Sequence, residues 1–180
     1  ETDDFTRFSL PTDFTANTGE TNLINTILED EKGIIWISGI ASGLFYFDRE
    51  KQQFLPYNVD QIVSINAMTA DKGPILWIAT LQNGLIKLNT DTGATEYFRH
   101  DPADPESISS DNIKTVVVDE EGTLWAGARS HGLNRMVEEN GKVGFIRYLN
   151  EKGNPLSLYN NSIYKLHIDL KGNLWTCNEN

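Results

Sequence analysis

The chain has 180 residues, of which 39% are hydrophobic and 10% aromatic, which is sufficient for a real hydrophobic core. Its net charge of −11 repels phosphate backbones and no basic patch offsets it, so we expect no nucleic-acid partner. The one cysteine, Cys177, has no partner for an intrachain disulfide or a multi-cysteine metal site. No apolar stretch is long enough to span a bilayer, so we expect no membrane contact by these residues.

A repeated pattern runs through the chain and is centred on its four tryptophans, which are separated by 41, 48 and 50 residues. In each copy an Ile precedes an Asp by six residues, a Gly follows the Asp, and an apolar residue precedes the Trp. The first three copies continue with Gly-Leu seven residues after the Trp. The repeated positions are Trp36, Trp77, Trp125 and Trp175, with Gly43, Gly84 and Gly132. Such a register indicates a structural repeat.

Each copy predicts four short strands. The stretch 24–29, like 113–118, is nearly continuously apolar or β-branched, as expected for an inner strand covered on both faces. A tight turn follows, because Asp caps backbone N–H groups and Gly accepts a positive φ. The Trp strand comes next, with Trp and its apolar neighbour facing opposite sides. Gly-Leu opens a third strand, and a more polar fourth strand ends in aromatic residues such as Phe145 and Tyr148.

Four antiparallel strands repeated with a large aromatic residue between sheets predict an all-β fold made of β-propeller blades. We expect a partial propeller of about four repeats within a single segment, 1–180. Its predicted parts are an outer strand of a preceding blade plus a linker (1–23), three blades (24–64, 65–112 and 113–162) and the inner half of a further blade (163–180).

The two ends of the segment raise the question of closure. Phe5 to Phe8 resembles the fourth-strand pattern, and the last copy stops after its second strand, so we expect a piece of a longer protein. An open arc exposes two apolar blade faces, which lowers solubility. Either the leading strand pairs with the trailing half-blade to close a small four-bladed ring, or the remaining blades come from a parent chain or a second copy, as in a homodimer.

The repeat resembles the regulator-propeller repeats of bacterial hybrid two-component sensors. The resemblance covers nearly the whole chain and rests on Asp-Glu-Glu-Gly-Thr-Leu-Trp-Ala-Gly at 119–127, Asn-Gly-Leu-Ile-Lys-Leu at 83–88, and His-Asp-Pro-Ala-Asp-Pro-Glu-Ser-Ile-Ser-Ser-Asp-Asn-Ile at 100–113. A second copy of the last phrase is Asn-Pro-Leu-Ser-Leu-Tyr-Asn-Asn-Ser-Ile at 154–163. The first linker, 58–63, is short and lacks the Asp-Pro phrase, so that loop contributes little to a binding face.

The resemblance implies a periplasmic sensor domain built of seven-bladed propellers. In that family a further β-domain, a membrane helix, a histidine kinase, a receiver and a DNA-binding domain follow, and none of these lies in the present residues. The ligands are carbohydrate fragments released during polysaccharide use. The implied partners are therefore an oligosaccharide and the other blades or domains of the parent sensor.

We expect no catalytic site, cofactor or metal site in these residues. His131 stands beside Ser130 and Arg129, but no Asp is positioned to complete a hydrolase triad, and the segment 39–43 does not match a nucleophile elbow. The Asp-Gly turns lack the ligand series of a calcium loop. His167, within an inner strand, is expected to be a hydrogen-bonded structural residue, and the fixed position of the tryptophans favours burial over sugar stacking.

Binding residues are expected in loops that differ between copies, because a shared position usually serves the fold. Loops joining second to third strands and linkers joining blades emerge on the same face of a propeller. The candidate ligand-binding residues on that face are Gln82, Asn83, His100, Arg129, His131 and Asn160. Their side chains can hydrogen-bond sugar hydroxyls. The alternatives are solvated loops, or a structural or protein-interaction propeller that mediates dimerisation without a small ligand; a lyase ranks third.

Overall fold

A computed structural model describes residues 4–8, 10, 24–39, 43–58 and 64–178. These residues contain fourteen strands and no helix. The first sheet comprises β1 (Ile24–Glu29), β2 (Ile35–Gly39), β3 (Gly43–Asp48) and β4 (Gln53–Tyr57). The second comprises β5 (Ile65–Asp71), β6 (Ile75–Thr80), β7 (Leu85–Asn89) and β8 (Thr95–Phe98). The third comprises β9 (Ile113–Val118), β10 (Leu124–Ala128), β11 (Leu133–Glu139) and β12 (Lys142–Tyr148), and the fourth β13 (Ile163–Ile168) and β14 (Leu174–Asn178).

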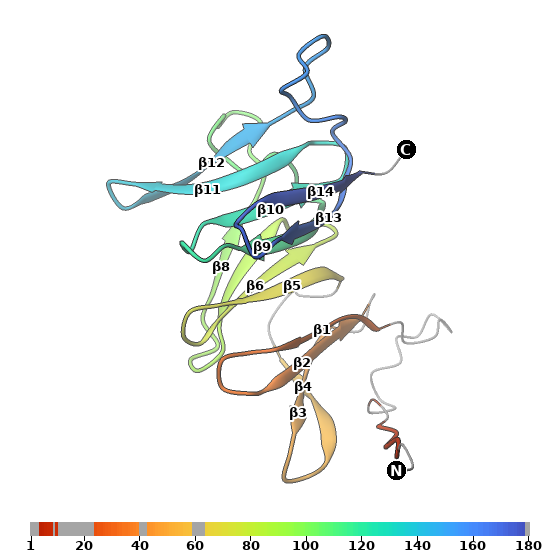
Figure 1. The fold of residues 1–180 in the computed structure, drawn as a ribbon. Helices are drawn as coiled ribbons and strands as arrows, with labels where there is room; N and C mark the ends of the chain where they lie inside the picture. Colours follow the sequence, from red (N-terminus) through yellow and green to blue (C-terminus); the bar gives the residue numbers. More distant parts are fainter. Residues whose placement is uncertain (1–3, 9, 11–23, 40–42, 59–63, 179–180) are drawn as a thin grey trace.

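The strands of each sheet are antiparallel and follow one another in chain order, which confirms the predicted all-β blade architecture. The described residues thus form three four-stranded blades and one two-stranded half-blade. The inner strands β1, β5, β9 and β13 contact one another in sequence, so successive blades stack face to face (Figure 1). The half-blade β13–β14 lies against β9 and β10.

The predicted leading strand at Phe5–Phe8 is not formed in the structure, where Asp4–Phe8 has no strand conformation. The Phe8 ring instead packs edge-on against Phe47 of β3, with ring centroids 4.8 Å apart. An outer strand needs a neighbouring strand to satisfy its backbone groups, and no described strand takes that place. Residues 11–23, the predicted linker, lie outside the described residues.

Each tryptophan packs between its own blade and the next one. Trp36 lies in a cluster with Ile65 and Met68 of the second blade, and Trp77 lies in a cluster with Ile113 of the third. Trp36 and Trp77 are only 1% and 4% exposed, whereas Trp175, which has no described blade after it, is 61% exposed. The predicted burial between blades therefore holds wherever a following blade is present.

The Asp before each tryptophan has two tasks. One carboxylate oxygen accepts backbone N–H groups of the turn, as predicted; Asp30 Oδ1 accepts from Lys32 and Ile34, both at 2.9 Å. The other oxygen accepts the indole N–H six residues later, at 2.8 to 3.2 Å in all four copies. The side chain that closes the turn thus also fixes the ring that fills the junction between blades.

The Asp119 carboxylate links this arrangement to pH. Partial burial opposes its ionisation, but hydrogen bonds from Thr123 and Trp125 outweigh that cost and hold its pKa below the ordinary value of 3.8. Because the folded-state pKa is depressed, the resulting stability is fully present above the unfolded-state pKa and is lost as the pH falls through the folded-state pKa.

We expect Asp119→Asn to destabilise the chain by roughly 1 kcal/mol at pH 7, because a neutral acceptor replaces a charged one. The gap between variant and wild type should narrow at pH 3, as measured by urea unfolding at both values. Glu120→Gln, a change at an exposed neighbour, is the control and should shift neither midpoint. An Asp119→Asn deficit that stays constant over this range would contradict the assignment.

Two glycines provide a matched test of the turn that opens the third strand. Gly73 and Gly84 both have a φ of +71°. A Cβ at Gly73 would meet nothing within 4 Å, but one at Gly84 would lie 2.1 Å from the Phe98 carbonyl oxygen. Gly73→Ala should therefore cost about 1 kcal/mol, from backbone strain alone, and Gly84→Ala at least about 2 kcal/mol more. Equal denaturation midpoints for the two variants would exclude this steric role.

Candidate functional site

The loops expected to carry binding residues meet along one edge of the sheets. We call this edge the loop rim; it consists of the turns 81–84 and 129–132 and the linkers 99–112 and 149–162. Backbone hydrogen bonds connect these segments. Gly84 N donates to Asp111 O at 2.9 Å and Arg129 N donates to Asn112 O at 3.1 Å, so the two turns attach to consecutive residues of one linker. Gly132 N donates to Asn161 O of the next linker at 2.8 Å.

Four of the six predicted binding residues lie in the turns of this rim. Gln82, Arg129 and His131 are exposed, and Asn83 is partly buried. Asn83 N donates to Thr80 Oγ1 at 2.8 Å, and its amide oxygen lies 3.5 Å from an Arg99 guanidinium nitrogen. The His131 ring nitrogen Nδ1 lies 2.9 Å from the Arg129 carbonyl oxygen. The groups displayed to solvent are thus an amide, a guanidinium and an imidazole.

The other two candidates hold the linkers in shape. The backbone N–H of His100 donates to Asp111 Oδ1 at 2.8 Å, and the His100 ring nitrogen Nδ1 lies 2.9 Å from Ile108 O. The Asn160 side-chain oxygen accepts from Ser162 N at 2.8 Å and from Asn178 Nδ2 at 3.0 Å. These polar atoms are therefore engaged within the protein, which leaves the turns as the better-placed part of the rim for contact with a ligand.

Groups suited to catalysis or metal binding do not gather among the described residues. No three His, Cys, Asp or Glu side chains in that part of the chain lie close enough to hold a metal ion. His167, expected to be hydrogen-bonded, is exposed on β13, opposite Trp175 of β14, and its side chain makes no hydrogen bond within the described segments. No helix that could cross a membrane occurs in the same residues.

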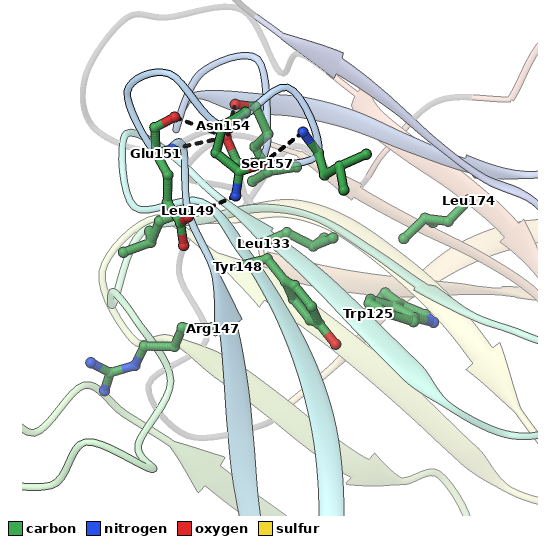
Figure 2. A pocket seen from close by; sticks show the side chains of 11 residues that line it. Trp125, Leu133, Arg147, Tyr148, Leu149, Glu151, Asn154, Ser157 and Leu174 are labelled. Carbon is green, nitrogen blue, oxygen red and sulfur yellow. Dashed lines mark hydrogen bonds between the residues drawn. The ribbon is translucent and has the colours of Figure 1, made fainter.

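A hollow of about 420 Å³ lies beneath the second linker rather than on the exposed turns (Figure 2). We call it the linker hollow; its walls include Trp125, Tyr148, Asn154, Ser157, Leu158 and Leu174. Aromatic and aliphatic side chains form one wall, and the polar linker forms the other. The sequence analysis did not predict it, because the hollow depends on how the linker folds back over β10 to β12.

Sequence reasoning also missed Arg147 of β12, which binds the preceding linker. Its guanidinium donates to Ser107 O at 2.7 Å, Ser107 Oγ at 2.8 Å and Asp104 O at 3.1 Å. Nearby, the buried Asn134 of β11 accepts from Ser109 N and donates to Ser109 Oγ, both at 2.9 Å. The only sequence signal for these contacts is a polar residue at an otherwise apolar strand position.

No protein-family model matches the chain, and no curated protein matches it. Solved structures do. The extracellular domain of the putative hybrid two-component system BT3049 from B. thetaiotaomicron is 22% identical, with a TM-score of 0.70 over 87% of this chain. That of BT4673 from the same organism is 22% identical, with a TM-score of 0.68 over 90%. PorZ, a surface component of the type-IX secretion system of Porphyromonas gingivalis, is 16% identical, with a TM-score of 0.64 over 87%.

The chain spans only about a fifth of the length of these proteins: 22% of BT3049, 21% of BT4673 and 24% of PorZ. At such identities the likeness concerns the fold. The chain therefore has the β-sheet architecture found in extracellular domains of hybrid two-component systems, whose chains extend well beyond the matched part.

Proposed function

We propose that this chain is a non-catalytic segment of a periplasmic sensor domain of a hybrid two-component system, and that it binds an oligosaccharide at the loop rim. The observation that carries the proposal is the pairing of this fold, found in extracellular domains of such systems, with a rim of polar groups that differ from one blade to the next. Histidine kinase activity belongs to the implied parent protein, outside these residues.

The chemistry of the exposed turns suits sugar recognition. The Gln82 amide both donates and accepts hydrogen bonds, and the Arg129 guanidinium presents several donors in a fixed plane. Both side chains are exposed on turns that attach to neighbouring residues of one linker. The net charge of −11 favours neutral glycans over polyanions, because the field of the whole chain opposes the approach of negative charge.

Catalysis is not part of the proposal. Hydrolysis by a nucleophile requires a base, a group that orients it and an oxyanion site. On the rim, His131 lies against the Arg129 carbonyl oxygen, and no described cluster of His and acidic side chains accompanies it. The rim therefore holds groups that bind hydroxyls rather than groups that cleave bonds.

A second function, a structural or protein-interaction propeller without a small ligand, is favoured by different observations. Large apolar side chains are exposed at the half-blade end, among them Leu156, Tyr159 and Trp175. The similar fold of PorZ also occurs in a component of a secretion system, not only in sensors. In this alternative the rim turns are ordinary solvated loops.

The two functions are distinguished by glycan binding. We expect the chain to bind neutral oligosaccharides on an immobilised array, and the double change Gln82→Ala with Arg129→Ala to weaken binding at least about tenfold, because hydrogen-bond donors are lost. Arg49→Ala is the matched control: Arg49 is an exposed arginine at the other edge of the first blade, where it bonds Gly33 O. Binding that survives the double change, or no binding to any glycan, supports the scaffold instead.

A further inference from the structure

The linker that precedes the third blade is clamped by the outer strand of that blade. Besides the contacts of Arg147, the backbone N–H of Phe145 donates to Glu106 O at 2.8 Å, and Lys142 forms an ion pair with Glu106 at 2.8 Å. The Phe145 ring packs edge-on against Phe98, with centroids 5.8 Å apart, in the cluster that contains Trp77 and Ile108. The β11–β12 hairpin thus covers the linker both by hydrogen bonds and by apolar contact.

The next linker has the same internal structure fifty residues later. Ser107 N donates to Asp104 O and Asp101 N to Ser107 Oγ; in the second linker Ser157 N donates to Asn154 O and Glu151 N to Ser157 Oγ. The N–H two residues after Asp104 or Asn154 donates to its side-chain oxygen, at 2.9 Å in both linkers. The second linker is therefore folded in the conformation that Arg147 binds in the first.

The acceptors of the second linker face the linker hollow. Asn154 and Ser157 line it together with Trp125, Tyr148 and Leu158, the counterparts of Trp77, Phe98 and Ile108 (Figure 2). No arginine among the described residues donates to these acceptors, and the Arg147 guanidinium bonds the preceding linker. Beside the hollow, Leu156 is 94% exposed and Tyr159 is 82% exposed.

The neighbouring sheet has a free edge. β14 pairs only with β13 in the described part of the chain, whereas β10, its counterpart in the third blade, also pairs with β11. The open edge and the linker hollow are thus the two surfaces that the β11–β12 hairpin covers in the third blade. An open edge of this kind is a template for an added strand.

We propose that the half-blade end of this chain is an acceptor site for a β-hairpin from another polypeptide. Its first strand adds to β14. Its second strand places an aromatic residue against Tyr148 and Leu158, and an arginine two residues further on donates to Asn154 O, Ser157 O and Ser157 Oγ. The partner is thus a hairpin with the pattern Gly-Leu in its first strand and Phe-x-Arg in its second. This inference does not rest on the proposed oligosaccharide binding.

Other occupants fit the two surfaces less well. Phe5 to Phe8 of a second copy also reads Phe-x-Arg-Phe, but a lone strand brings no partner for β14. Face-to-face stacking of a second copy on Trp175 leaves the acceptors of Asn154 and Ser157 unmet. A small anion or a neutral sugar cannot supply the charged donors that carbonyl oxygens bind most strongly.

The probe is a peptide of residues 132–149, the chain's own β11–β12 hairpin, added to the full 180-residue chain. We expect saturable binding by calorimetry and a change in tryptophan fluorescence that disappears in the Trp175→Phe chain. In the peptide, Arg147→Ala and Phe145→Ala should each weaken binding at least about tenfold, because one loses charged hydrogen bonds and the other a buried ring. Glu139→Ala, at the exposed end of the hairpin, is the control and should bind like the parent peptide.

Because short hairpins are marginally stable in water, a second measurement keeps the proposal testable. A chain extended after Asn180 by a copy of residues 131–149 should unfold at higher urea, and Arg147→Ala in the added copy should remove most of the gain. The proposal fails if neither peptide nor extension has an effect, or if the Arg147→Ala forms act like the parents. It also fails if a peptide of residues 1–23, or a dimer that the hairpin cannot displace, occupies the site.

Discussion

The structure depends on one arrangement repeated at every junction: a tryptophan that lies between two blades while an aspartate of its own blade accepts its indole N–H. Burying an indole is favourable only if its one donor is paired, and the aspartate meets that need from the turn that starts the same strand. Blade shape and blade stacking are thereby coupled, since loss of the turn loosens the ring that the next blade packs against. The gradient from buried Trp36 to exposed Trp175 follows directly from this coupling.

Much of the fold could be predicted from the sequence because its determinants are local and repeated. The spacing of Trp125 and Gly132 is the same in three copies and locates the second and third strands, and the observed sheets agree with it. The turn role of Asp119 was predicted as well. Its bond to the indole was not, although the constant interval of six residues between Asp and Trp is a signal for it.

The remainder could not be predicted because it depends on contacts across long sequence separations or on partners outside the segment. Nothing local connects Arg147 with Ser107, forty residues earlier. For the candidate site, residue type alone could not tell that His100 turns its ring toward a linker carbonyl whereas Gln82 is exposed. The strand pattern at Phe5 needs a neighbouring strand to become a strand, and no described strand provides one.

The attachment of the linker to the blade that follows it affects how such chains can be divided. Arg147, Phe145 and Asn134 all bind the segment that leads into their own sheet, so the unit that folds together begins at the linker and ends with the outer strand. Gene fusions, truncations and rearrangements that cut between an outer strand and its following linker keep this unit whole. Cuts at the start of an inner strand separate a blade from the segment that its third and fourth strands grip.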